Sequence, residues 1–402
     1  MNKLTNRKDI RKMILLFTFT YMISYVTRIN YGAVISEMVK DTGISKALLS
    51  MALTGSFITY GAGQVVSGIC GDKFQPKKLV FYGFCLTILM NIIIPFCKSP
   101  YTMLGVWCVN GFAQAFMWPP IVRLMTAFFS DEEYKSASVK ISWGSSLGTI
   151  IIYLVSPLII TVSGWRGVFI FSAVCGIIMA FIWNKLCINV EVEKPVTSKG
   201  EKVKGDIKPL FTPLMFGIML AIILQGMLRD GVTTWMPSYI GETYDLGTAV
   251  SILTGVVLPL FSIACFHISS ALYRKKLTNP VLCAGVIFGA GAVSAIALYV
   301  LTGSNPVFSV FFSALLTGSM HGVNLMLICM IPPFFQKYGV VSTASGVLNS
   351  CTYIGSAVST YGIALISEKM GWNFTLLTWI VIAVLGTVVC FVCAKPWQKE
   401  KM

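Results

Sequence analysis

Residues 21–32 read YMISYVTRINYG and place an arginine in the middle of an apolar segment that runs from about residue 12 to residue 38. A segment of this length and composition can cross a lipid bilayer as a helix. A guanidinium at that depth costs about 2.5–3.5 kcal/mol on insertion scales. Arg28 must therefore be compensated by its surroundings or used by the protein.

The composition of the whole chain also favours a membrane protein. Of its 402 residues, 55% are hydrophobic and only 12% are charged. A soluble protein of this size has too little interior to hide so much apolar surface, so we predict an all-α polytopic membrane protein. The twelve cysteines are scattered through apolar segments and are interpreted as small buried hydrophobic residues, not as disulfides or metal ligands. The basic N-terminus runs into the first apolar segment without a cleavage site, which predicts a retained first helix.

Hydropathy predicts twelve transmembrane helices, and the loops between them fix their orientation. When successive loops are assigned to alternate sides, one side carries 22 of the 31 Lys and Arg residues and the other side carries five. By the positive-inside rule both termini are cytoplasmic. The net charge of +15 then reflects topology, and no nucleic-acid partner is expected. The predicted spans are 12–38, 48–71, 78–97, 101–129, 136–162, 166–187, 210–240, 247–272, 280–302, 306–334, 340–366 and 372–394.

One long polar interruption divides the chain into two halves. It contains EVEKPVTSKGEKVKGD and separates a six-helix half at 1–187 from another at 210–402, with a cytoplasmic linker at 188–209. The halves share short motifs in the same order, beginning with an arginine inside spans one and seven. Two six-helix halves in parallel repeat are similar to the layout of the major facilitator fold, in which substrate binds near mid-bilayer between the halves. The matched motifs are Arg28 with Arg229, MWPP (117–120) with MIPP (330–333), SSLG (145–148) with TYIG (352–355), and SGWRGVF (163–169) with KMGWNFT (369–375).

The loop after span two reads GxxxDKxxxKK from residue 68 and resembles a loop signature of the same superfamily. Its first glycine permits close helix packing. Asp72, followed by Lys73, can pair with basic groups or with a helix terminus, which predicts a structural or gating role. The alternative is an ordinary polar turn.

The two matched arginines suggest an anion site. Arg28 and Arg229 converging on one cavity would repel each other when it is empty and would bind a divalent anion, because each offers a forked pair of donors. The alternative is that each arginine reaches the membrane surface or pairs locally, as Arg229 could with Asp230. Asp230 lies about 100° around the helix from Arg229, so structural and gating roles are both open for it. Tyr21 and Tyr25 share one helix face with Arg28 and either bind the anion or pack.

Three further polar residues lie inside predicted spans. Arg123 and Lys140 are near cytoplasmic ends, where reaching toward the surface or pairing between helices is expected. His321, within GSMHGVN, either contacts substrate or carries a proton, or has a structural role.

These motifs resemble the organophosphate:phosphate antiporter family, which includes glycerol-3-phosphate and hexose-6-phosphate transporters. The carrying motifs are YxxxYxxRxNY from Tyr21, WPPxxR from Trp118 and RDGxxxWxPxY from Arg229. The resemblance implies that Arg28 and Arg229 hold phosphate. It departs where Ser145 replaces a histidine, Gln64 a lysine and His321 a tyrosine. The aromatic positions that it implies along the cavity are Tyr21, Tyr25, Tyr60, Trp118 and Tyr353.

The resemblance implies a secondary active transporter that exchanges an organic phosphate ester for inorganic phosphate by rocker-switch alternating access. Two alternatives stay open: a proton-coupled symporter of a sugar acid or other carboxylate, and a membrane sensor of a phosphorylated sugar. No nucleophile–base set or phosphate-cradling loop predicts an enzyme, and no cofactor or metal is expected. We expect a monomer in a bacterial cytoplasmic membrane whose partners are small anions and the bilayer.

Overall fold

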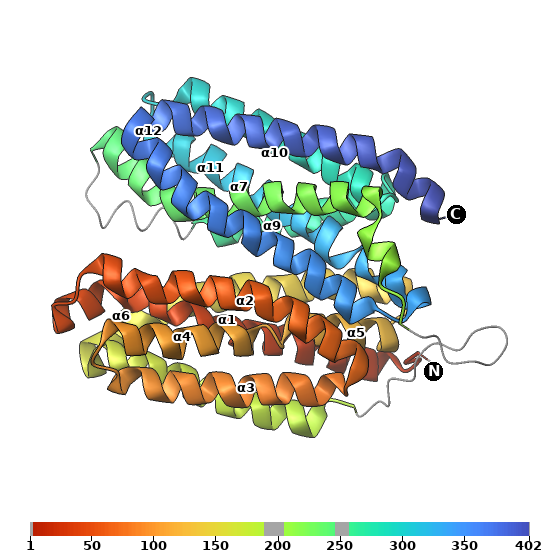
Figure 1. Ribbon diagram of the computed structural model, residues 1–402, viewed down its shortest axis with the longest axis horizontal. Coiled ribbons are helices and arrows are strands. Elements are labelled where there is room, and N and C mark those ends of the chain that lie inside the picture. Colours follow the sequence, from red (N-terminus) through yellow and green to blue (C-terminus); the bar gives the residue numbers. More distant parts are fainter. Residues whose placement is uncertain (1–2, 189–204, 246–256, 402) are drawn as a thin grey trace. The chain divides into compact units, whose positions relative to one another are not determined.

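The computed structural model describes residues 3–188, 205–245 and 257–401, and all regular secondary structure within these ranges is helical (Figure 1). Most of the predicted linker and the beginning of the predicted span 247–272 lie outside the described residues. The helices are α1 (Arg7–Thr42), α2 (Lys46–Lys73), α3 (Pro76–Ile93), η1 (Ile94–Phe96), α4 (Pro100–Gln114), α5 (Trp118–Phe128), α6 (Asp131–Leu186), η2 (Lys208–Phe211), α7 (Pro213–Tyr244), α9 (Val257–Lys275), α10 (Pro280–Leu301), α11 (Pro306–Asn324), the π-helical η3 (Leu325–Cys329), η4 (Pro332–Tyr338) and α12 (Val341–Lys401).

Short polar signals begin most of these helices. Ser130 caps α6 in a reciprocal capping box, in which its side chain accepts from the Glu133 backbone N–H and the Glu133 carboxylate accepts from the Ser130 backbone N–H. Elsewhere a capping side chain is followed directly by a proline, whose fixed φ and missing N–H suit the first turn. These cap–proline pairs are Ser99–Pro100, Thr212–Pro213, Asn279–Pro280 and Asn305–Pro306.

The two longest helices, α6 and α12, each cover two predicted spans. In α6 the helical geometry is interrupted at Gly164, where φ is 66°. In α12 it is interrupted at Gly371, where φ is 78°. Glycine adopts this left-handed region without the steric penalty of a Cβ. Each long helix is therefore two helices joined at a glycine, as the separate spans predicted.

Two predicted spans are interrupted by proline pairs. The span 101–129 is divided into α4 and α5, because the chain turns between them immediately before Trp118, Pro119 and Pro120. Proline lacks the backbone N–H that continues a helix, and its ring clashes with the carbonyl four residues earlier. The span 306–334 likewise ends its α-helix at Asn324, continues as π-helix, and passes into η4 at Pro332.

Seven helices in the described residues are long and apolar enough to cross a membrane by length and composition alone. One of the seven is the whole of α6, and another lies in the C-terminal part of α12. Large apolar side chains also point outward along them, for example Val162, Phe181 and Val392. Such exposure suits a surface that faces lipid.

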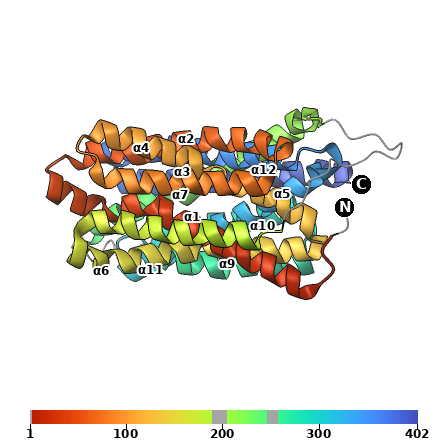
Figure 2. The same ribbon diagram turned by 90° about the horizontal axis from the view of Figure 1, so that it is seen from below.

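Chain contacts divide the protein into two compact units, each described here by itself. Unit 1 comprises Met1–Ile207 and Pro332–Ser350. Within it α1 packs along α6, α2 along α4, and α3 against both α4 and α6 (Figure 2). The segment Pro332–Ser350 belongs to the second half in sequence but packs with unit 1. The boundaries 1–187, 188–209 and 210–402 stay a prediction.

Unit 2 comprises Lys208–Ile331 and Cys351–Met402. Helix α11 packs against α7, α9 and α10, and the π-helical segment that follows it stays in contact with α10 (Figure 1). Gln225 of α7 donates a hydrogen bond to the Met320 carbonyl of α11 at 3.2 Å, and Asn279 donates to the Ala394 carbonyl at 2.8 Å. These amides connect helices that are otherwise apolar.

The same close helix approach occurs in both units. A Cβ added at Gly148 of α6 would collide with the carbonyl oxygen of Met22 in α1. A Cβ added at Gly355 of α12 would collide with the carbonyl oxygen of Ile223 in α7. Met22 and Ile223 each lie six residues before the intramembrane arginine of their helix. Glycine at both positions lets the two helix backbones come into contact, so SSLG and TYIG permit the same close helix packing in the two units.

Candidate substrate-binding site

Arg28 lies beneath aromatic rings in unit 1. Its guanidinium carbon is 4.2 Å from the ring centroid of Tyr25 and 4.6 Å from that of Tyr60, which belongs to α2. The faces of these rings are electron-rich and attract the cation. Such contacts compensate part of the cost of burying the charge.

Further aromatic residues extend this surface. The Tyr21 ring packs edge-on against Tyr25 with centroids 5.2 Å apart and lies 5.1 Å from the Trp118 ring. Four of the aromatic positions implied by the family resemblance therefore lie together in unit 1. The indole N–H of buried Trp118 has no hydrogen-bond acceptor among the described residues, so it is a donor that a bound ligand could use.

A buried amide network, which the sequence analysis missed, holds α1 beside Arg28. Asn91 and Asn110 donate to the Thr27 carbonyl at 3.0 and 3.3 Å. Gln114 donates to the Thr27 hydroxyl at 2.8 Å, and Asn30 donates to Asn91 at 2.7 Å. All five residues are buried. Amides inside predicted spans were the available signal, because buried polar groups in a membrane helix require partners.

Gln64 and Ser145 make hydrogen bonds that connect or stabilise helices. Gln64 donates to the Ala115 carbonyl at 3.4 Å and accepts from Asn349 at 3.1 Å, so it joins α2 to the first turns of α12. Ser145 donates to the Ser142 carbonyl of its own helix at 2.7 Å. Their substrate-binding roles stay predictions.

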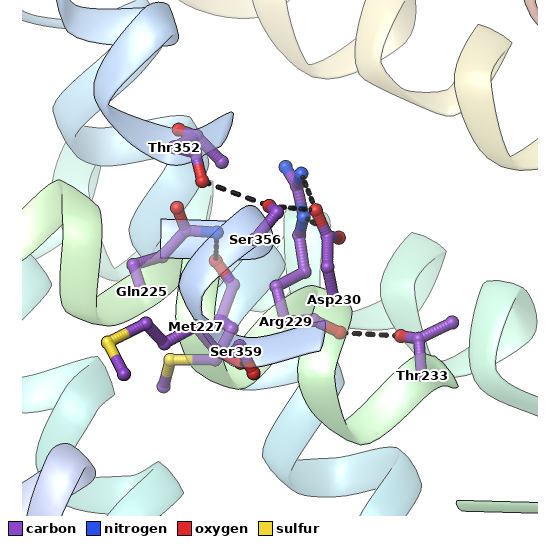
Figure 3. Close-up of polar contacts among 9 residues, drawn as sticks. Gln225, Met227, Arg229, Asp230, Thr233, Thr352, Ser356 and Ser359 are labelled. Carbon is purple, nitrogen blue, oxygen red and sulfur yellow. Dashed lines mark hydrogen bonds and ion pairs between the residues drawn. The ribbon is translucent and has the colours of Figure 1, made fainter. Parts of the chain in front are cut away.

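Arg229 forms a two-bond ion pair with its neighbour in unit 2 (Figure 3). Its Nε donates to Asp230 Oδ1 at 2.7 Å and its Nη2 donates to Asp230 Oδ2 at 2.8 Å. Adjacent residues on a helix point about 100° apart, but the long arginine side chain spans that difference. The local pairing that sequence left as an alternative for Arg229 is therefore present.

Asp230 is also held from a second helix. Ser356 of α12 donates its hydroxyl to Asp230 Oδ2, and the Ser356 hydroxyl oxygen lies 2.9 Å from the Thr352 carbonyl oxygen (Figure 3). His321 of α11 is half-buried, packs edge-on against Phe266 with centroids 5.6 Å apart, and interacts electrostatically with both members of the pair. Of the predicted residues in unit 2, Arg229, Asp230 and His321 are thus brought together, and Tyr353 is buried in α12.

Asp72 is the centre of a second polar cluster in unit 1. Its carboxylate lies 3.3 Å from Arg123 Nη1, and both side chains are less than a tenth exposed. It also accepts the backbone N–H groups of Ser342 and Thr343 at 3.0 and 2.7 Å. These N–H groups belong to the first turn of α12, where unpaired donors and the helix dipole favour an anion.

The other predicted charged residues lie at the surface: Lys73 and Lys140 are both exposed. A Cβ at Gly68 would lie 2.7 Å from the Ser342 carbonyl, so the first glycine of the loop signature does permit close packing. Within the described ranges no group of three or more metal-binding side chains occurs.

The sequence matches the family model described as Major Facilitator Superfamily over residues 17–360. The chain belongs to this superfamily. Two solved major facilitator structures have the same fold. An outward-conformation FucP transporter has a TM-score of 0.74 at 11% identity and covers 96% of this chain and 98% of its own. A XylE proton:xylose symporter has a TM-score of 0.77 at 12% identity and covers 96% and 95%.

Several curated bacterial proteins have related sequences. A "Probable hexose phosphate transport protein" of Chlamydia muridarum is 23% identical, covering 88% of this chain and 84% of its own. A "Glycerol-3-phosphate transporter" of Bacillus subtilis is 24% identical, covering 94% and 90%. The "Membrane sensor protein UhpC" of Salmonella typhimurium is 23% identical, covering 90% and 86%. This major facilitator protein is a multi-pass membrane transporter by family and not an enzyme.

Proposed function

We propose that this protein exchanges an organic phosphate ester for inorganic phosphate across the bacterial cytoplasmic membrane, with both termini in the cytoplasm. One observation carries the proposal: Arg28 and Arg229 lie at equivalent positions in two units that repeat the same helix packing. The names of the relatives, which include hexose phosphate and glycerol-3-phosphate transporters, support this choice of substrate. The protein works as a monomer by alternating access.

In this proposal each arginine binds one side of the phosphate group. A guanidinium presents a planar fork of donors that matches two phosphate oxygens, and two such groups neutralise a dianion. Tyr21, Tyr25, Tyr60 and Trp118 line the unit 1 side. Gln64, Ser145, His321 and Tyr353 complete the substrate-binding set. Asp72, Lys73, Arg123, Lys140 and Asp230 have structural or gating roles.

Replacing Arg28 with lysine tests the arginine pair. Lysine keeps the charge but loses the fork, so exchange of radiolabelled phosphate in phosphate-loaded proteoliposomes should fall at least about tenfold. Arg166→Lys is the matched control, because Arg166 is half exposed and pairs with Asp41 at 2.8 Å. Exchange that stays at the wild-type rate in Arg28→Lys contradicts the proposed site.

The Arg229–Asp230 pair favours one alternative function. An intramembrane carboxylate beside His321 is a group that could take up a proton, as a symporter of a sugar acid requires. Uptake of a sugar acid driven by a pH gradient, into vesicles without internal phosphate, would identify this function.

The sensor relative supports a second alternative. A sensor of a phosphorylated sugar would bind its ligand without moving it across the bilayer. Measurable binding of glucose 6-phosphate to the purified protein, with no exchange in proteoliposomes, would identify a sensor.

A further inference from the structure

The two equivalent arginines differ in what surrounds them. Arg28 lies under the rings of Tyr25 and Tyr60. Arg229 directs two of its five N–H groups to the Asp230 carboxylate, which neutralises it. The position equivalent to Asp230 in unit 1 is Ile29. The acidic residue of unit 2 therefore has no acidic counterpart at the equivalent position of unit 1.

The hydroxyl that holds this acid has its own counterpart. Ser356 of α12 lies 2.9 Å from the Thr352 carbonyl and also donates to Asp230. In unit 1 the equivalent residue, Thr149, donates to the Ser145 carbonyl at the same distance of 2.9 Å. Ser356 therefore holds the same carboxylate as Arg229, from a second helix (Figure 3).

We propose that Asp230 is an internal counter-anion, which the oxyanion of the substrate displaces from Arg229 and which neutralises Arg229 whenever the site is empty. This inference rests on the proposed function, because it takes Arg229 to bind the substrate anion. In this role Asp230 sets how tightly the inward and outward movements of substrate are coupled.

An unpaired guanidinium in a low-dielectric cavity makes a conformational change of the empty protein costly, which enforces exchange. Asp230 removes that cost at Arg229, so the empty protein changes conformation and net movement of substrate accompanies exchange. The same pair lowers affinity, since an incoming phosphate or carboxylate must take over the two N–H groups that Asp230 occupies. Once displaced, the carboxylate keeps the hydroxyl of Ser356 as its donor.

Asp230→Asn separates these effects, because asparagine keeps the size and an acceptor for Ser356 but removes the charge. Proteoliposomes are loaded with radiolabelled inorganic phosphate, and efflux is measured into medium with and without unlabelled phosphate. We expect the ratio of net efflux to exchange to fall about tenfold in the variant. Equilibrium binding of phosphate to purified protein should tighten about tenfold, equivalent to about 1.4 kcal/mol.

Two hydroxyl variants form a matched pair. Ser356→Ala removes the donor that the displaced carboxylate would keep, so equilibrium binding of phosphate should weaken about threefold. Thr149→Ala removes the equivalent hydroxyl from unit 1, where Ile29 stands at the position of the acid, and should leave phosphate binding within about twofold of wild type. If Asp230→Asn does not yield a monodisperse protein, this pair decides the question by itself.

The possible results distinguish the inference from the proposed function. If Asp230→Asn has the wild-type ratio and Ser356→Ala has the wild-type affinity for phosphate, while Arg28→Lys abolishes exchange, the counter-anion is overturned and the exchanger stands. Wild-type protein that neither binds nor moves phosphate overturns both. A loss of phosphate affinity in Thr149→Ala as large as in Ser356→Ala also overturns the counter-anion, because the effect would then belong to the hydroxyl.

Discussion

Trp165 and Trp372 occupy the same structural position in their two units. The indole N–H of Trp165 donates to Asp41 at the end of α1 at 2.9 Å, and that of Trp372 donates to Glu242 at the end of α7 at 2.7 Å. Asp41 and Glu242 each lie thirteen residues after the intramembrane arginine of their helix. Each tryptophan directly follows the glycine at which its long helix is interrupted. The repeat thus extends to individual hydrogen bonds and supports treating Arg28 and Arg229 as equivalent.

Low pH should weaken the hydrogen bond between Trp165 and Asp41. The hydrogen bond from Trp165, followed by that from Arg166, lowers the pKa of Asp41 below its ordinary value of 3.8. A carboxylate with a lowered folded-state pKa adds stability above its unfolded pKa, and this stability is lost as pH falls through the folded value. The melting temperature should therefore decline below about pH 4 by less in Asp41→Asn than in wild type.

Trp165→Phe removes the main cause of that shift and keeps the carboxylate. Its melting temperature should show a smaller acid-dependent decline than that of wild type. An equal decline in all three proteins would show that Asp41 does not contribute.

The ring of Tyr60 should matter more than its hydroxyl. Tyr60→Phe keeps the aromatic face that lies over Arg28, whereas Tyr60→Leu removes it. A desolvated cation–π contact is worth about 2 kcal/mol, and an exposed one about 0.5–1 kcal/mol. Phosphate binding, measured by calorimetry, should weaken about threefold to tenfold in Tyr60→Leu and remain near wild type in Tyr60→Phe. Equal loss in the two variants would assign the effect to the hydroxyl.

Removing the charge of Asp72 should destabilise unit 1. Arg123 would lose its carboxylate partner while both side chains are almost fully buried, and breaking such a pair costs about 3–5 kcal/mol. Asp72→Asn should therefore unfold at a clearly lower temperature in detergent.

Asp131→Asn is the control for this prediction. Asp131 also pairs with a cation, Lys3, at 3.7 Å, but its side chain is 93% exposed. Exposed pairs contribute about 0–1 kcal/mol, so this change should barely move the transition. Similar shifts for the two variants would contradict a buried ion pair at Asp72.

Substitution by alanine should destabilise the protein at Gly148 but not at Gly105. A Cβ at Gly148 meets the backbone of α1, which cannot move aside as a side chain can. A Cβ at Gly105 in α4 meets nothing within 4 Å, and alanine favours a helix over glycine by about 0.5–1 kcal/mol. Thermal unfolding should show a lower transition for Gly148→Ala and an equal or higher one for Gly105→Ala. A stable Gly148→Ala protein would refute the close packing of α1 on α6.

Much of the fold could be predicted because it depends on local signals. Apolar length predicts the spans, and the repeat of an arginine in spans one and seven is readable along the chain. The proline pairs at Pro119 and Pro332 are also visible as a repeat, and they interrupt two spans that apolar length alone predicts as continuous. A proline pair inside a predicted span is sufficient reason to expect the helix to be interrupted.

The remaining features depend on contacts between distant residues. Gln64 accepts from Asn349, 285 positions away, and no local pattern predicts that pairing. The Arg229–Asp230 pair was also underestimated, because the angular offset of adjacent residues neglects the reach of arginine. Asp230 also accepts a hydrogen bond from Ser356 on another helix, and no local pattern predicts that contact.

Helix α12 begins in one unit and ends in the other. Its first ten residues, Val341–Ser350, pack with unit 1, where Asp72 and Gln64 hold them by hydrogen bonds, and the rest belongs to unit 2. A helix resists bending, since each residue is fixed by bonds to the turns on either side. Any displacement of one unit against the other must therefore bend α12 near Cys351 or break the hydrogen bonds at Asp72 and Gln64. The first ten residues of α12 therefore tie Asp72 and Gln64 of unit 1 to the part of the same helix that belongs to unit 2.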